Sequence, residues 1–367
     1  MFRITSWTEI PVIIMLILGV TLYSPRIQAA DQYIPIDSYV AQHPEQRAVM
    51  DEFAKIVRAA AQPVTIASQR LVRIAIIYPS IQASDYWRRS VVSFERRLHA
   101  LQLPYELKLF SSYPVIDSAL QSQQLSEALQ WQPDYLVFTL DIASQGRMIE
   151  RLMSRGKPKL ILQNITTPLQ RWQTPRPFMY VGFDHTKGSE LMAKKMIEEI
   201  NQQGKYLMLY LSLGYISQMR GGTFVREAAK YPDVIEVGAY YTDNNKEKAY
   251  QATLNAVQKD PDLKMIFACS TDVALGALQA LQETGRLDIL LNGWGGGDAE
   301  LEALTQGLDL TVIRINDDNG IAMAEAIKLD QLNQEARIPH IFSGDMELLD
   351  NRTSGAEIKR LKQQAFR

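Results

Sequence analysis

Cysteine and histidine are scarce in this sequence. The 367 residues include one cysteine, Cys269, and four histidines, His43, His99, His185 and His340. A single cysteine cannot form a disulfide within the chain, so the fold must depend on its hydrophobic core, and Cys269, in an apolar run, is expected to be a small buried residue. The histidines do not fall at the spacings of metal ligands. We therefore expect neither structural disulfides, nor a metal site, nor a cofactor.

Phosphate-binding and catalytic loops are missing as well. The first predicted strand, Val72–Tyr78, is followed by residues 79–85 (PSIQASD) instead of the glycine-rich turn of dinucleotide-binding folds. The later run Gly293–Gly297 follows a strand near the end of the chain, which is the wrong place for that turn. The sequence has no Walker loop and no Gly-x-Ser-x-Gly elbow. These absences argue against an enzyme.

An excess of charge of either sign is absent too. The 39 basic and 41 acidic residues give a formal net charge of −2. Because the two signs are interleaved along the chain, we expect no broad basic face for nucleic acid or an anionic membrane.

The only long apolar run lies at the N-terminus and is short for a membrane span. Arg3 precedes an apolar stretch from Pro11 to Leu22, and Ala29 and Ala30 follow it. This layout predicts a signal peptide over residues 1–29. The alternative is a retained membrane anchor, but the run has about 12 residues where a span needs roughly 20. A lipoprotein would need a cysteine just after the run. We therefore expect export to the periplasm as a soluble protein.

Beyond residue 70, short apolar runs alternate with longer amphipathic runs. This alternation predicts βα units with parallel strands covered on both faces by helices. A run of ten strands exceeds one sheet of ordinary size, so we expect an α/β protein with two lobes. Residues 31–70 form a surface extension with a helix around Asp51–Ala60. The predicted strands are 72–78, 105–110, 135–140, 160–163, 179–183, 206–211, 234–240, 265–269, 289–291 and 310–314.

Polar and aromatic residues gather at the carboxyl ends of these strands, where open α/β sheets bind ligands. Each residue has another explanation: a helix cap, a turn or, for Trp87, a place in the core along the stripe that runs through Val91 and Phe94. Their number favours a lined cleft. The candidate binding residues are Gln82, Ser84, Trp87, Thr139, Asn164, Arg220, Thr271, Asp272, Trp294 and Arg314.

The two arginines carry the clearest chemical signal. Arg314 ends the apolar strand 310–314, where its guanidinium must meet an anion, a carbonyl or Asp272 to offset its desolvation. Arg220 is expected early in the helix after Gly214, where it adds to the positive end of the helix dipole. Together they predict a ligand with negative charge or many oxygen acceptors.

The segment 271–285 (TDVALGALQALQETG) resembles a signature of the ribose-type periplasmic sugar-binding proteins. Asp184 with Gly188, Arg220 with Gly222, and Gly307 support the resemblance, which spans residues 71–342. It implies a type I periplasmic binding protein with a multi-strand hinge. The N-terminal lobe would comprise residues 30–183 and about 296–333, and the C-terminal lobe residues 184–295 and about 334–367. The related DNA-binding repressors are excluded, because a signal peptide takes the place of their DNA-binding helices.

Within this family the sequence most resembles the periplasmic receptors of vibrios for the quorum-sensing signal autoinducer-2, a furanosyl borate diester. All ten candidate residues match the ligand contacts expected there. The resemblance implies that Arg220 and Arg314, one from each lobe or its hinge-side edge, neutralise the borate, and that Trp87 and Trp294 bracket the ring. It also implies a partner, the periplasmic domain of a membrane sensor kinase of the LuxQ type. Thr271, where sugar binders usually have asparagine, weakens a plain ribose assignment.

Three functions remain open from the sequence. The first is a receptor whose lobes close on autoinducer-2, so that binding shifts an open–closed equilibrium. The second is a ribose-type sugar-binding protein that feeds an ATP-driven importer. The third is an exported sugar-modifying enzyme, which would turn its ligand over.

Overall fold

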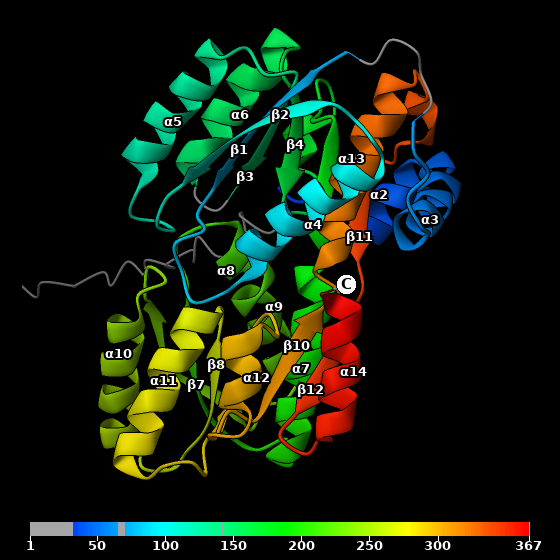
Figure 1. Ribbon diagram of the computed structural model, residues 1–367. Coiled ribbons are helices and arrows are strands. Elements are labelled where there is room, and N and C mark those ends of the chain that lie inside the picture. The colour runs from blue at the N-terminus through cyan, green and yellow to red at the C-terminus, as the bar shows by residue number, and fades with distance from the viewer. Residues whose placement is uncertain (1–31, 65–69, 141–142, 367) are drawn as a thin grey trace, which may run out of the picture.

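The computed structural model describes residues 32–64, 70–140 and 143–366, and it has two α/β lobes joined by a hinge (Figure 1). The predicted signal peptide lies outside the described residues. Within the described part, no helix has the length and apolar character needed to cross a membrane. The two-lobed α/β fold predicted from the sequence is confirmed.

The N-terminal lobe is built on a six-stranded sheet in the order β11-β5-β4-β3-β1-β2, in which every neighbouring pair is parallel. Helices cover both faces of the sheet, with α4 and α13 on one and α5 and α6 on the other (Figure 1). The elements are β1 (Val72–Tyr78), α4 (Tyr86–Ala100), β2 (Tyr105–Ser111), α5 (Ser118–Gln130), β3 (Tyr135–Thr139), α6 (Ala143–Arg155), β4 (Lys159–Gln163), the 3-10 turn η1 (Gln170–Trp172), β5 (Met179–Phe183), α13 (Asp317–Gln331), the 3-10 turn η2 (Glu335–Arg337) and β11 (Ile341–Gly344).

The C-terminal lobe contains a parallel sheet in the order β7-β6-β8-β9, and the antiparallel pair β10-β12 continues it. Parallel bridges from Asn292 to Leu310 and from Gly295 to Ile313 join the two. Its elements are α7 (His185–Glu199), β6 (Gly204–Tyr210), α8 (Tyr215–Met219), α9 (Gly221–Ala228), β7 (Val234–Tyr241), α10 (Lys246–Lys259), β8 (Leu263–Ala268), α11 (Thr271–Thr284), β9 (Leu290–Leu291), α12 (Asp298–Ala303), β10 (Leu310–Arg314), β12 (Met346–Asp350) and α14 (Gly355–Ala365).

Strand pairing corrects the predicted lobe boundaries near the C-terminus. Residues 296–315 were assigned to the N-terminal lobe, but β10 pairs with β12 in the C-terminal lobe. Residues 334–344 were assigned to the C-terminal lobe, but β11 pairs with β5 in the N-terminal lobe. Within the described ranges, the chain therefore crosses between the lobes three times, after β5, between β10 and α13, and at Asp345 between β11 and β12. These crossings form the hinge.

Strands β1, β3, β4 and β5 have almost no solvent-exposed face, because successive residues point into two different hydrophobic cores. Ile74 and Ile76 of β1 pack under α4 and α13, whereas Ala75 and Ile77 pack under α5 and α6. Burial on both faces explains why these strands read as continuous apolar runs. The alternation of short apolar and longer amphipathic runs thus produces layers of helix, sheet and helix.

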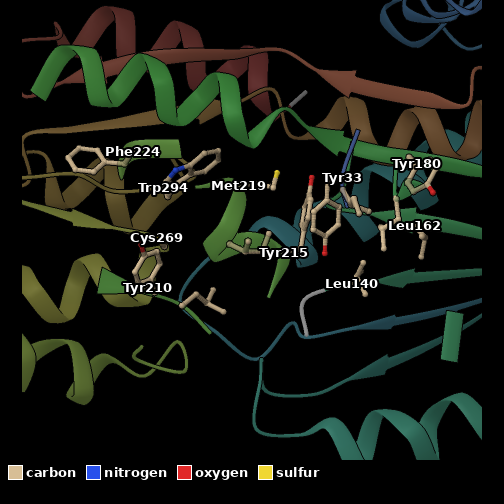
Figure 2. Close-up of a cluster of buried hydrophobic side chains, with 14 of the residues drawn as sticks. Tyr33, Leu140, Leu162, Tyr180, Tyr210, Tyr215, Met219, Phe224, Cys269 and Trp294 are labelled. Carbon is tan, nitrogen blue, oxygen red and sulfur yellow. The ribbon is translucent and has the colours of Figure 1, made fainter. Parts of the chain in front are cut away.

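The N-terminal extension wraps the hinge side of the molecule. It contains α2 (Ile36–Gln42) and α3 (Glu45–Arg58), which starts earlier than the predicted helix at 51–60. Tyr33 bridges to Leu169 of the N-terminal lobe and packs its ring 5.0 Å from Tyr215 of the C-terminal lobe. Figure 2 shows these two rings side by side within one buried cluster. The extension therefore contacts both lobes.

Candidate functional site

The carboxyl ends of the strands in the two lobes face each other across an interlobe cavity of about 480 Å³, part of it open to solvent. Only about 40 Å³ of this space can hold a water-sized sphere, so the two lobes lie close together at the cavity. The N-terminal lobe contributes the loop after β1, the start of α4 and the end of β4. The C-terminal lobe contributes the ends of β6, β8 and β10 and the loop after β9. The predicted residues that line the cavity are Gln82, Ser84, Trp87, Asn164, Arg220, Thr271, Trp294 and Arg314.

Two of the predicted residues lie outside this lining. Thr139 is buried at the end of β3. Asp272 is in the first turn of α11, and its carboxylate accepts hydrogen bonds of 3.1 and 3.2 Å from the backbone N–H of Ala83 in the other lobe. The structure thus places Asp272 in a contact between the lobes.

Arg314 is 5% exposed, and its guanidinium lies 4.2 Å from the ring centre of Tyr86. Its Nε atom is 3.5 Å from the carbonyl oxygen of Gly295. Among the residues that the structure describes, no carboxylate is within ion-pair distance of this guanidinium. Burial lowers the pKa of Arg314 below its usual value, because desolvation disfavours the cation. The sequence offered an anion, a carbonyl or Asp272 as the partner of Arg314, and the structure shows a carbonyl, that of Gly295. The carboxylate of Asp272 accepts from Ala83 instead.

Arg220 is also 5% exposed, and it lies at the junction between α8 and α9. It is the last residue before α9, which differs from the predicted place early in the helix after Gly214. One Nη donates to the carbonyl oxygen of Cys269 over 2.7 Å, and the guanidinium lies 3.8 Å from the ring centre of Trp294. Both arginines come from the C-terminal lobe, and Arg314 lies at its hinge-side edge, at the end of β10. Of the two arrangements expected, the structure shows the hinge-side position and not one arginine from each lobe.

Aromatic side chains cover both sides of the cavity. Trp87, at the start of α4, packs against Tyr78 and Tyr86 with ring centres 4.5 and 4.7 Å apart. It also lines the cavity, so the core and binding roles weighed for it are compatible. Trp294 lies in the loop after β9 and is 1% exposed. The two indoles come from opposite lobes.

Asn164 supplies a polar atom at the end of β4. It has a φ of +67°, a left-handed conformation that asparagine tolerates better than most residues. Its Oδ1 atom is buried and has no hydrogen-bond partner within the described part of the chain. A buried amide oxygen without a partner costs free energy, so a ligand hydroxyl or N–H that reaches it would gain a favourable contact.

His185 is buried next to two residues of the cavity lining, and the sequence, where it looked like an isolated histidine, did not indicate this. It lies 3.0 Å from the carbonyl oxygen of Asn164 through Nε2 and 3.4 Å from Nε of Arg220 through Nδ1. Burial first, and then the positive charges of Arg220 and Arg314, hold the pKa of His185 well below its usual value. The neutral ring can donate from Nε2 and accept from Arg220, so it links the two lobes and orients the guanidinium.

Tyr86 and Glu300 were also missed. Tyr86 supplies the ring on which Arg314 lies, and its hydroxyl accepts from the side chains of Gln163 and Asn319. Glu300 is buried behind the loop after β9. The sequence places Tyr86 in a helix turn and Glu300 among other acidic residues, so neither stood out as a site residue.

The chemistry of the cavity suits recognition. It offers two guanidinium groups, two amides, hydroxyls and two indole faces. Burial raises the pKa of the Cys269 thiol to about 12, so this thiol is not an activated nucleophile. Within the described ranges, no group of three histidine, cysteine, aspartate or glutamate side chains could hold a metal ion.

Comparison with known protein families agrees with this architecture. A family model for a periplasmic binding protein domain matches residues 74–328, which is more than half of the chain. The D-apiose import binding protein of Actinobacillus succinogenes is 26% identical over 125 residues, 33% of this chain and 39% of that protein. The ribose import binding protein RbsB of Escherichia coli is 21% identical over 171 residues, 46% of this chain and 57% of that protein. The chain thus spans less than two thirds of the length of these relatives.

Solved structures share the fold at low identity. A solute-binding protein of an ABC transporter from Agrobacterium vitis, bound with α-D-tagatopyranose, aligns with a TM-score of 0.71 at 18% identity. That alignment covers 79% of this chain and 98% of the other. A second, from Actinobacillus succinogenes with bound D-allose, has a TM-score of 0.66 at 21% identity and covers 79% and 99%. At these identities the likeness establishes the fold.

Proposed function

Because the chain belongs to the periplasmic binding protein family, we propose that it is a periplasmic receptor for an anionic, oxygen-rich small molecule, the furanosyl borate diester form of autoinducer-2. The observation that supports this proposal is the pair Arg220 and Arg314. Both guanidinium groups are buried at the cavity, and Arg314 has no carboxylate within ion-pair distance in the described structure. A buried cation without a counter-charge favours a ligand that brings one.

The proposed binding mode uses the whole lining. The arginines neutralise the borate oxygens, Asn164 accepts from a ligand hydroxyl, and the indoles of Trp87 and Trp294 cover the apolar faces of the ring. Because these groups come from both lobes, a ligand that contacts all of them binds the closed form more tightly than the open form. Binding therefore shifts the population toward closure.

We further propose that the closed shape is the signal. In this proposal the protein is exported by its N-terminal signal peptide and associates with the periplasmic domain of a membrane sensor kinase of the LuxQ type. Ligand-driven closure would change the surface that both lobes present together, and thereby the balance between kinase and phosphatase activity.

A second candidate is a sugar-binding protein that feeds an ABC importer. The matched relatives favour it, since they include import binding proteins for ribose and D-apiose. Neutral sugars also suit a cavity lined with tryptophan, asparagine and arginine, because hydroxyls can accept from a guanidinium. This candidate predicts a ligand without charge and without boron.

Calorimetric titration separates the two candidates. The purified protein is titrated with autoinducer-2 plus borate, with autoinducer-2 freed of boron, and with ribose. The receptor proposal expects the tightest binding with borate and recovery of the ligand unchanged after denaturation. Ribose binding without any effect of boron would overturn it in favour of the importer candidate, and a chemically altered ligand would indicate an enzyme.

Substitution of the arginines tests the charge argument. Arg314→Ala removes a buried charge-assisted contact, which we expect to cost about 2 kcal/mol, or roughly 30-fold in Kd, for the borate ligand. Arg286→Ala is the matched control, because Arg286 lies on the surface of the same lobe and pairs with Asp288. Unchanged borate-dependent binding in the double variant of Arg220 and Arg314 would show that the charge argument is wrong.

A further inference from the structure

The loop of Gly293–Gly297 carries two groups that shape the cavity. Trp294 places its indole beneath Arg220, and the carbonyl oxygen of Gly295 lies next to Arg314. The backbone of this loop is unusual, since φ is +148° at Gly295 and +63° at Gly296, values that residues other than glycine rarely adopt. Because four of its five residues are glycine, the backbone of this loop needs anchors to hold one conformation.

Glu300 supplies those anchors. Its side chain, in the first turn of α12, is 0% exposed. Oε1 accepts from the hydroxyl of Thr271 over 2.6 Å and from the backbone N–H of Trp294 over 2.8 Å. Oε2 accepts from the backbone N–H of Gly296 over 2.8 Å and from the hydroxyl of Thr311 over 2.5 Å. One carboxylate therefore ties together the loop, the start of α11 and strand β10.

These four donors explain how a buried carboxylate is tolerated. Among the described residues, no lysine or arginine is within ion-pair distance of Glu300, so hydrogen bonds provide its compensation. The fit leaves no room for another side chain, because a Cβ at Gly293 would lie 2.7 Å from the carboxyl group. An ionised carboxylate only accepts hydrogen bonds, which matches a site made of four donors.

We propose that Glu300 is a positioning residue for ligand binding, which sets the place of Trp294, of the Gly295 carbonyl and of Thr271 without touching the ligand. This inference rests on the proposed binding function of the cavity. The effect reaches both arginines, because Trp294 lies under Arg220 and also donates from its indole N–H to Ser189 over 3.3 Å, while Gly295 contacts Arg314. Glu300 thus connects the parts of the site that the C-terminal lobe supplies.

Glu300→Gln tests the proposal with almost no change in volume. The amide nitrogen of glutamine cannot accept a hydrogen bond, so either Trp294 or Gly296 loses the acceptor of its backbone N–H. We expect at least a tenfold rise in Kd and a shifted indole N–H resonance of Trp294 in the ligand-free protein, assigned by comparison with Trp294→Phe. Glu302→Gln is the matched control on the same helix, where the side chain is exposed.

A general loss of stability is controlled by Leu281→Ala, which removes a fully buried side chain of α11 away from the loop. This variant should lower the melting temperature without raising Kd or moving the Trp294 resonance. If Glu300→Gln leaves both Kd and that resonance at the values of Glu302→Gln, the positioning role is wrong.

The proposal on Glu300 and the identity of the ligand can fail separately. Should the protein bind ribose and not the borate ligand, the receptor function fails, but the rise in Kd can be measured with ribose. Should none of the tested ligands bind, the shift of the indole resonance in the ligand-free protein still decides whether Glu300 positions Trp294.

Discussion

At the scale of single residues, His185 shows how the site controls its own charge. The imidazole sits between the Asn164 carbonyl and the guanidinium of Arg220, and it is fully buried beside two cations. Protonation there would add a third positive charge to the same small volume. The neutral ring instead serves as an acceptor that holds Arg220, so the positive charge of the site comes from the arginines alone.

The depressed pKa of His185 predicts lower stability in mild acid. In the unfolded chain the imidazole gains a proton below pH about 6.5, whereas the folded protein stays neutral there, so the unfolded state binds more protons. Above pH 6.5 the protonation of His185 does not lower the unfolding free energy. As the pH falls below that value, the unfolding free energy decreases. We expect a slope of up to about 1.4 kcal/mol per pH unit from this group. His340, whose pKa burial lowers to about 4, adds a second contribution of the same sign.

Chemical denaturation between pH 7.5 and 5 measures this dependence. His185→Gln removes the titration but keeps an N–H that can donate to Asn164. The slope of its unfolding free energy against pH should therefore be smaller, by the amount that corresponds to about one bound proton. His340→Gln serves as the comparison, because it removes the other depressed histidine. An identical slope in His185→Gln and the natural protein would contradict the assignment.

Eight of the ten candidate residues line the cavity. They could be selected from the sequence because the rule that selects them, a position at the carboxyl end of a predicted strand, is geometric. Parallel strands put their carboxyl ends at one edge, and polar residues after several strands must therefore meet. The two residues outside the lining are Thr139, which is buried at the end of β3, and Asp272, whose carboxylate faces the backbone of the opposite lobe. The rule also missed His185, Tyr86 and Glu300. Their roles depend on partners that lie far away in the sequence, and spacing contains no information about those partners.

At the scale of elements, helix α3 of the N-terminal extension depends on a buried arginine. Arg97 of α4 donates to the carbonyl oxygens of Ala59 and Ile56, at the carboxyl end of α3, over 2.9 and 3.1 Å. Its guanidinium also pairs with Glu325 of α13, 2.5 Å away, which is 0% exposed. A cation at the end of a helix satisfies the last carbonyls and complements the dipole. The extension is thus attached to the core of the N-terminal lobe.

Arg97→Met should detach α3 and leave Glu325 with Lys328 alone. Loss of one partner of a buried ion pair typically costs about 3 kcal/mol or more, so we expect a clear fall in the unfolding free energy. Hydrogen exchange should also become faster in α3. Arg47→Met is the control, because the Arg47–Asp37 pair is largely exposed and should contribute less than about 1 kcal/mol. Equal losses in the two variants would count against the proposed attachment.

The elements that the sequence predicted best are those with strong burial on both faces. The ten predicted strands are all present, with ends shifted by a residue or two. Strands β11 and β12 were missed, because each is short and has a mixed burial pattern, and a single residue separates them. That single residue, Asp345, is also where the chain changes lobes. The missed strands are therefore the reason why the predicted lobe boundaries near the C-terminus were wrong.

At the scale of the whole molecule, the lobes touch each other around the cavity. Beside the contact of Asp272 with Ala83, Arg89 of α4 pairs with Asp298 of α12 over 2.8 Å. On another side, Tyr215 of the C-terminal lobe lies 2.9 Å from the hydroxyl of Thr167 in the N-terminal lobe and packs on Tyr33. These contacts join the two lobes directly, and each contributes to the balance between open and closed forms.

Asp272→Ala should shift this balance toward the open form. The hydrogen bonds to Ala83 require the lobes to be close, so their loss destabilises only the closed form. Because Asp272 is partly exposed, we expect the closed form to lose only about 1 kcal/mol of stability, which corresponds to roughly a fivefold rise in Kd. Small-angle X-ray scattering of the ligand-free protein should show a larger radius of gyration. Asp288→Ala, whose carboxylate pairs with Arg286 within one lobe, is the control.

The ligand dependence of these losses distinguishes closure from recognition. Because Asp272 acts on the open–closed equilibrium, Asp272→Ala should weaken every ligand by the same factor, charged or neutral. Arg314→Ala should instead weaken an anionic ligand more than a neutral sugar, since it removes a charge at the cavity. If Asp272→Ala changes the ratio of the affinities for the borate ligand and ribose, Asp272 contacts the ligand directly. Its side chain would then belong to the binding site, as the sequence first suggested.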